Sequence, residues 1–82
     1  MRIIAVSHVR AFWENNRDAE QPLKSWVDEV KKATWRQPAD IKDQYRSASV
    51  LKNRRVVFNI KGNDYRLVVS VAYRYQAVYV KF

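Results

Sequence analysis

The sequence has no cysteine and only one histidine, one glycine and two prolines among its 82 residues. Without cysteine it can form neither a disulfide framework nor a cysteine metal site. A single histidine argues against a His-based metal site or a Ser-His-Asp triad. The lone glycine, Gly62, excludes a Gly-rich loop that would cradle a phosphate. We therefore expect no metal ion and no small-molecule cofactor.

Long apolar runs are absent as well. No run approaches the roughly 20 residues that span a bilayer. Arg10 and Glu14 interrupt the N-terminal segment where a signal peptide would have its apolar core. The apolar content of 48% is nonetheless far too high for a disordered tail. Residues 1–82 are therefore expected to form one small domain in the cytoplasm, without a membrane partner.

Negative charge is scarce in the second half of the chain. Residues 1–41 hold seven Lys/Arg and six Asp/Glu, whereas residues 42–82 hold nine Lys/Arg and two Asp/Glu. The formal net charge of +8 therefore belongs almost entirely to the second half. This concentration favours a polyanion partner, either nucleic acid or an acidic protein segment. A solubilising basic surface is the alternative.

Apolar spacing predicts a short strand and two helices in the first half of the chain. Residues 1–6 are expected to form the strand, and Ser7 is expected to cap a helix that ends at residues 15–16. The second helix is predicted to begin at Asp18 and to end near residues 34–36. Two short elements are expected to follow, a helical turn at residues 39–44 and a brief strand or packed loop at residues 50–51.

Both predicted helices carry an apolar stripe at helical spacing. The first stripe consists of Val9, Phe12 and Trp13. This spacing predicts that the aromatic side chains pack on a sheet as core, and a base-stacking platform is the alternative. The second stripe contains Leu23, Trp26, Val27, Val30 and Ala33.

Residues 55–74 contain the strongest signal, a β-hairpin with one apolar and one basic face. The Gly62-Asn63 pair at its centre suits a two-residue type II′ turn, which places Lys61 opposite Asp64. Because side chains alternate along a strand, this register sorts both strands into two faces. The core face pairs Ile60 with Tyr65, Phe58 with Leu67 and Val56 with Val69, while the other face pairs Arg55 with Ser70, Val57 with Val68 and Asn59 with Arg66.

A second hairpin is expected to follow, with Tyr75-Gln76 as its turn. The resulting fold class is α+β, a β-α-α-β-β-β chain in which two helices pack on one face of an antiparallel sheet. The turn pairs Tyr73 with Val78, Val71 with Val80 and Val69 with Phe82 on the core face. The open face is basic and carries Arg55, Asn59, Lys61, Arg66, Arg74, Tyr79 and Lys81.

The basic face has the chemistry of a phosphate site. Lys and Arg bind phosphate oxygens, Arg bidentately. The same charges can stabilise the transition state of RNA cleavage by the neighbouring 2′-OH, a reaction that needs no metal. That reaction also needs groups that move protons, and the face has no obvious general base. His8 is far from this face in the sequence and is interpreted as structural or solvent-facing. For Arg66 the alternative is an ion pair with Asp64 or with a helix Glu.

A resemblance to a known family covers nearly the whole chain. Residues 53–67 read Asn-Arg-Arg-Val-Val-Phe-Asn-Ile-Lys-Gly-Asn-Asp-Tyr-Arg-Leu, which resembles the signature of the HigB-type toxins in the RelE superfamily. The resemblance implies a RelE-like fold and an mRNA interferase, an endoribonuclease that cleaves mRNA in the ribosomal A site. It also implies a helix-turn-helix (HigA-like) antitoxin. Similarity extends to the opening Met-Arg-Ile-Ile, to Phe12-Trp13-Glu14, to Leu23 and Trp26, and to Trp35.

The resemblance also assigns expected roles to single residues. Arg66 matches the family's strand arginine, which contacts the scissile phosphate, and Lys61 matches a basic residue at the hairpin. These two are the candidate catalytic residues. The family pattern continues past Phe82 through a Thr-His-x-Glu-Tyr-Asp segment, so a truncated toxin with reduced cleavage is expected. The candidate RNA-binding residues are Arg55, Asn59, Arg74, Tyr79 and Lys81.

Two other functions are compatible with the residues. One is a non-catalytic module whose basic face docks RNA or the antitoxin. The other is a DNA-binding domain, which is disfavoured because the longer helix places its basic residues beside acids and shows no recognition-helix pattern.

Overall fold

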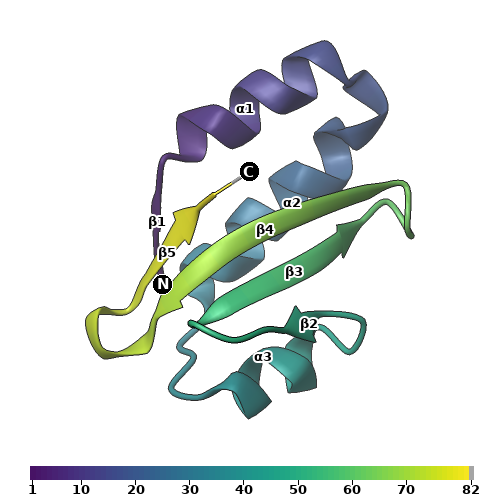
Figure 1. Cartoon of the computed structure of the whole chain (residues 1–82). Helices are drawn as coiled ribbons and strands as arrows, with labels where there is room; N and C mark the ends of the chain where they lie inside the picture. Colours follow the sequence, from purple (N-terminus) through teal and green to yellow (C-terminus); the bar gives the residue numbers. More distant parts are fainter. Residues whose placement is uncertain (82) are drawn as a thin grey trace.

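The computed structural model describes residues 1–81, which fold into an α+β domain with three α-helices packed on a five-stranded mixed sheet (Figure 1). The predicted fold class is therefore confirmed. The helices are α1 (Val6–Asn15), α2 (Glu20–Lys32) and α3 (Pro38–Gln44), with short 3-10 turns η1 (Arg17–Ala19) and η2 (Tyr73–Tyr75). The strands are β1 (Arg2–Ile4), β2 (Ser49–Val50), β3 (Arg55–Ile60), β4 (Tyr65–Ala72) and β5 (Ala77–Val80).

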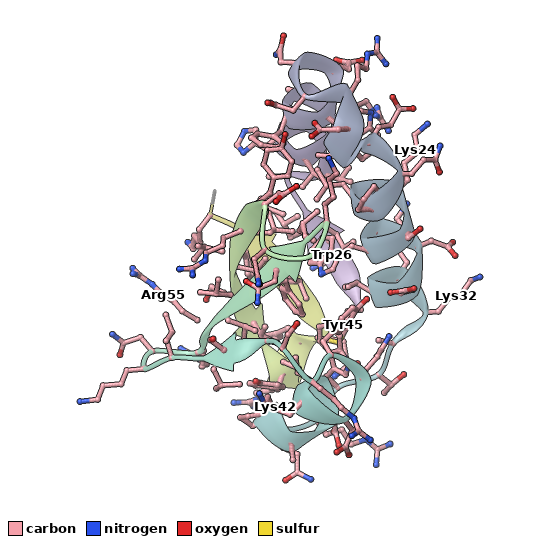
Figure 2. The ribbon with its side chains drawn as sticks, turned by 90° about the vertical axis from the view of Figure 1, so that its right-hand side faces the viewer. Lys24, Trp26, Lys32, Lys42, Tyr45 and Arg55 are labelled. Carbon is pink, nitrogen blue, oxygen red and sulfur yellow. The ribbon has the colours of Figure 1, made fainter. Side chains whose placement is uncertain are left out.

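The helices cover one face of the sheet and leave the other open. The strand order is β1-β5-β4-β3-β2. In Figure 2, α2 lies on one side of the strands and Arg55 points away on the opposite side. The buried positions of α2 follow the predicted stripe and face the sheet. Among residues 1–81, no helix is long and apolar enough to cross a membrane.

Phe58 on β3 lies at the centre of the core. Its ring packs edge-on against Trp26 at 5.4 Å and against Tyr45 at 5.1 Å, and it stacks on Trp35 at 6.0 Å. These partners come from α2, from the segment after α2 and from the residue that follows α3. One side chain of the hairpin therefore joins the helical layer to the sheet. Phe58 is almost fully buried, with 1% of its surface exposed.

The pairing of β1 corrects the expectation of a wholly antiparallel sheet. β1 lies parallel to β5, with Ile3 paired to Val78. The Met1 amino group donates hydrogen bonds to the carbonyl oxygens of Ala33 (2.6 Å) and Lys31 (3.3 Å), which fixes β1 at the end of α2. The first and last strands of the chain are joined by no turn, so no local sequence signal reports that they are neighbours.

The register of the first hairpin is confirmed at all six ladder pairs of β3 and β4. The ladder ends at Ile60 and Tyr65, one pair earlier than predicted. Lys61 and Gly62 both have positive φ angles, 52° and 65°, and the Asp64 N–H donates to the Lys61 carbonyl oxygen at 3.2 Å. Lys61 and Asp64 thus belong to the loop at the hairpin tip rather than to the two strands.

The predicted register of the second hairpin is wrong by two residues. Val69 pairs with Val80, whereas the predicted partner, Phe82, lies outside the described residues. The connection is the 3-10 turn η2 followed by Gln76 in a left-handed conformation (φ 52°), which is longer than a two-residue turn. A shift of two residues returns every side chain to the same face. The faces assigned to β4 and β5 were therefore correct although their pairs were not.

The helix ends differ from the predictions in detail. Ala5, with φ 69°, occupies the N-cap of α1, and Ser7 lies inside the helix without a capping hydrogen bond. α2 begins after η1 and ends at Lys32, earlier than expected. The helical turn expected at residues 39–44 is α3, which buries Ile41 in the core. The uncertain segment at residues 50–51 contributes Val50 to the edge strand β2.

Candidate nucleic-acid interface

The sheet face turned away from the helices presents a group of polar and basic side chains from β3, β4 and the end of β5. Alternation along each strand places them opposite the core positions Phe58, Leu67 and Val80. Figure 2 shows Arg55 extending from this face into solvent. We call this surface the bare face and define it by Arg55, Asn59, Arg66, Tyr79 and Lys81, with Val57, Val68 and Ser70 between them.

Three side chains of the bare face form its centre. Asn59 pairs directly with Arg66 across β3 and β4. Lys81 lies beside Val68, because its N–H donates to the Val68 carbonyl oxygen at 2.9 Å, and Arg66 is the diagonal neighbour two residues along β4. Diagonal neighbours on a sheet are about 7–8 Å apart, within reach of long side chains. Arg66 and Lys81 can therefore contact one phosphate together.

The positive charge of the bare face is not compensated. No salt bridge within residues 1–81 involves Arg55, Arg66 or Lys81. All eight acidic residues lie on helices, on η1 or at the hairpin tip, and none lies on a strand. The alternative of an Arg66 ion pair with Asp64 or a helix Glu is therefore not observed. An exposed cation without an acidic partner is available to an external anion.

Lys61 is turned away from this centre. Its ammonium contacts the Asp18 carboxylate at 2.8 Å and the Asp64 carboxylate at 3.6 Å. The Tyr65 hydroxyl donates to the other Asp18 oxygen at 2.7 Å. Hydrogen bonds from Lys61 and Tyr65 lower the pKa of Asp18, and the hydrogen bond to Asp18 raises the pKa of Lys61. The structure thus places this candidate catalytic residue against η1, on the helix side of the hairpin.

Arg74 also lies apart from the centre. It belongs to η2, beyond the end of β4 that is opposite to Arg66. The six steps along β4 from Arg66 to Ala72 span about 20 Å. Its guanidinium lies 5.9 Å from the centre of the Tyr75 ring. The structure brings together Asn59, Arg66 and Lys81, with Arg55 and Tyr79 farther along the same face, but it does not add Arg74 to them.

The structure brings His8 close to Arg66, which the sequence interpretation missed. Both residues line one small cavity of about 30 Å³, whose other lining includes Phe12 and Tyr65. β1 lies parallel to β5 and leads into α1, so α1 begins beside the end of β5 (Figure 1). No turn joins β1 to β5, so the sequence gives no local signal for their pairing. The proximity of His8 to Arg66 could therefore not be predicted from the sequence. Histidine is the side chain best suited to proton transfer near neutral pH.

Residues 19–82 match the protein-family model HigB_toxin, which is described as the RelE-like toxic component of a toxin-antitoxin system. The chain belongs to the HigB toxin family. It is therefore a toxin of a toxin-antitoxin system, and an antitoxin is its expected partner. A search of curated proteins found no match.

The HigB toxin match covers every residue of the bare face but not β1 or α1. His8 and Phe12 therefore lie in the part of the chain that the match does not reach. Within residues 1–81, no group of three or more His, Cys, Asp or Glu side chains is arranged to hold a metal ion. The site combines exposed cations on the sheet with an imidazole on α1, residue types that can bind an anion and transfer a proton.

Proposed function

We propose that this HigB-family toxin is a ribosome-associated mRNA endoribonuclease that grips the scissile phosphate with Arg66 and Lys81. The observation that carries the proposal is the uncompensated positive charge of the bare face in a chain of this toxin family. The substrate is mRNA in the cytoplasm, and the inhibiting partner is a helix-turn-helix (HigA-like) antitoxin.

The chemistry follows from the neighbouring 2′-OH of the RNA. Its oxygen attacks the adjacent phosphorus, the bond from phosphorus to the 5′ oxygen breaks, and the products carry a 2′,3′-cyclic phosphate and a 5′-OH. Negative charge grows on the phosphoryl oxygens during this step, and Arg66 and Lys81 stabilise it. His8 is the candidate base that takes the 2′-OH proton. The 5′ oxygen receives its proton from the imidazolium or from water.

The test is cleavage of mRNA on purified ribosomes together with binding of a short single-stranded RNA. Arg66→Ala should weaken binding about 10- to 100-fold, as expected for loss of charge-assisted hydrogen bonds, and should lower cleavage at least as much. Arg66→Lys should restore part of both. Arg74→Ala removes another exposed arginine, about 20 Å away, and is the matched control. Equal losses of RNA affinity and of cleavage in Arg66→Ala and Arg74→Ala would contradict a specific phosphate site at Arg66.

A second candidate function is a non-catalytic module that binds RNA or the antitoxin through the bare face. It is favoured by one observation, namely that Arg55, Asn59, Arg66 and Lys81 include no general base near neutral pH. His8→Ala distinguishes the two candidates. Loss of cleavage with retained RNA binding supports the endoribonuclease, whereas Arg66-dependent binding without any cleavage by the unmodified chain supports the module.

A further inference from the structure

α1 has an exposed stripe beside its buried one. His8, Ala11, Phe12 and Asn15 follow the spacing of one helix face, and all four are exposed. The buried positions of the same helix are Val9 and Trp13. The aromatic stripe predicted as core is therefore divided, because Trp13 enters the core and Phe12 remains 37% exposed.

The exposed stripe forms one wall of an open hollow. Among the described residues, its lining consists of His8, Ala11, Phe12, Asn15 and Asn16 from α1 and its end, and Lys81 after β5. The hollow measures about 400 Å³, which accommodates a single nucleobase. Lys81 belongs to the bare face as well, so the hollow adjoins the proposed phosphate site.

The ring of Phe12 is held in a fixed orientation. It packs against the Tyr65 ring with a centroid distance of 5.3 Å and an interplanar angle of 84°. Tyr65 is itself held by its hydrogen bond to Asp18. A fixed, partly exposed aromatic ring loses little conformational entropy when a base stacks on it.

The amide groups at the end of α1 provide acceptors beside this ring. Asn15 Nδ2 donates to the Ala11 carbonyl oxygen at 3.1 Å, and Asn16 Nδ2 donates to the Phe12 carbonyl oxygen at 3.0 Å. These bonds fix both amides, and no described residue donates to either Oδ1 atom. The two oxygens can accept from the exocyclic amino group of adenine, cytosine or guanine, which uracil lacks.

We propose that this hollow binds one unstacked RNA base, which stacks on Phe12, next to the phosphate held by Arg66 and Lys81. The inference rests on the proposed RNA-cleaving function and names the part of the substrate that α1 contacts. Single-stranded RNA is recognised in this way, by bases that stack on aromatic side chains while cations hold the backbone. The same geometry positions the ribose near His8.

The test measures binding of a short single-stranded RNA in which each nucleotide in turn is made abasic. In the unmodified chain, one abasic position should weaken binding about 5- to 100-fold, the range for loss of one stacked base. Phe12→Leu keeps an apolar group against Tyr65 but removes the aromatic face. It should bind the intact RNA as weakly as the unmodified chain binds that abasic RNA, with no further loss on combining the two changes. Phe12→Trp should restore both the affinity and the sensitivity to the abasic position.

The outcomes separate this inference from the proposed function. Unchanged affinity in Phe12→Leu, together with weakened binding in Arg66→Ala, would overturn the base site and leave the phosphate site standing. An equal abasic penalty in Phe12→Leu and in the unmodified chain would also overturn it. If the unmodified chain binds no RNA, the proposed function fails and the base site fails with it.

Discussion

The two faces of the β3–β4 hairpin come from alternate residues of the same two strands, but their surroundings are opposite. On the helix-covered face, Phe58 packs against three aromatic rings. On the bare face, Arg55 and Arg66 extend into solvent without an acidic partner in residues 1–81. Alternation alone creates this division, because successive side chains point to opposite sides of a strand. One face therefore carries stability, and the other is free to carry function.

The distribution of acidic residues sharpens the difference. Acids lie among the cations of the helical layer, where Glu20 pairs with Arg17 and Lys24. At the hairpin tip, Asp18 attracts Lys61 to the helix side. No acid lies on the strands themselves. The α-helices and η1 hold six Lys/Arg and seven Asp/Glu, so the net charge of +8 comes from the strands and loops, including the three cations of the bare face.

The largest effect is expected on the helix-covered face. Phe58→Ala should lower the free energy of unfolding by about 3–5 kcal/mol, because it removes a buried ring and leaves a cavity among its partners. That loss is a large part of the stability of a small domain, so Phe58→Leu provides a milder variant that should still fold. Urea unfolding followed by circular dichroism measures both.

Arg55→Ala is the matched control on the bare face. The free energy of unfolding of Arg55→Ala should differ from that of the unmodified chain by no more than about 0.5 kcal/mol, because an exposed side chain without partners contributes little to folding. Comparable losses of unfolding free energy in Arg55→Ala and Phe58→Leu would contradict the conclusion that the helix-covered face, and not the bare face, stabilises the fold.

The first hairpin was predictable because two signals agreed. The Gly62-Asn63 tip and the alternation of Val56, Phe58 and Ile60 are compatible with the same register, and six ladder pairs follow it. In the second hairpin, Gln76 adopts a left-handed conformation, and a glutamine gives no sequence signal for it. Alternation cannot detect an error of two residues, since that error leaves both faces unchanged.

The site was predictable as far as it depends on strand faces. Arg55, Asn59 and Arg66 lie on the bare face as expected. Lys61 contacts Asp18, which is 43 residues away in the sequence, and no local pattern reports such a contact. The place of Phe12 over the sheet end likewise depends on the β1–β5 pairing, which joins the two ends of the chain.

A smaller effect is expected at the tip, where the two faces are held in register. Gly62 has a φ of 65°, and a Cβ added there would have no atom within 4 Å. Gly62→Ala should therefore cost about 1 kcal/mol from backbone conformation alone. Asn63→Ala is the control, since Asn63 is not among the residues with positive φ. Equal unfolding midpoints in urea for the two variants would indicate that the tip tolerates a non-glycine conformation.

The smallest effect concerns acid stability at the Asp18–Lys61 contact. Asp18 accepts hydrogen bonds from Lys61 and Tyr65, which hold its pKa below the ordinary value of 3.8. A carboxyl with a lower pKa in the folded chain stabilises the fold above its unfolded pKa, and this contribution is lost as the pH falls through the folded pKa. Asp18→Asn should therefore flatten the fall in stability below about pH 4. The change should be small, because the Asp18 side chain is 49% exposed and screened by water and salt.

Urea unfolding at a series of acidic pH values, at low and high salt, measures this change. Asp43→Asn is the control, because it removes the same charge from a residue without a salt bridge in residues 1–81. If stability falls less steeply with decreasing pH in Asp18→Asn but not in Asp43→Asn, Lys61 is held by Asp18 on the helix-covered side of the hairpin. The same pH dependence in the two variants would mean that Asp18 does not hold Lys61, and that this lysine is available to an external anion.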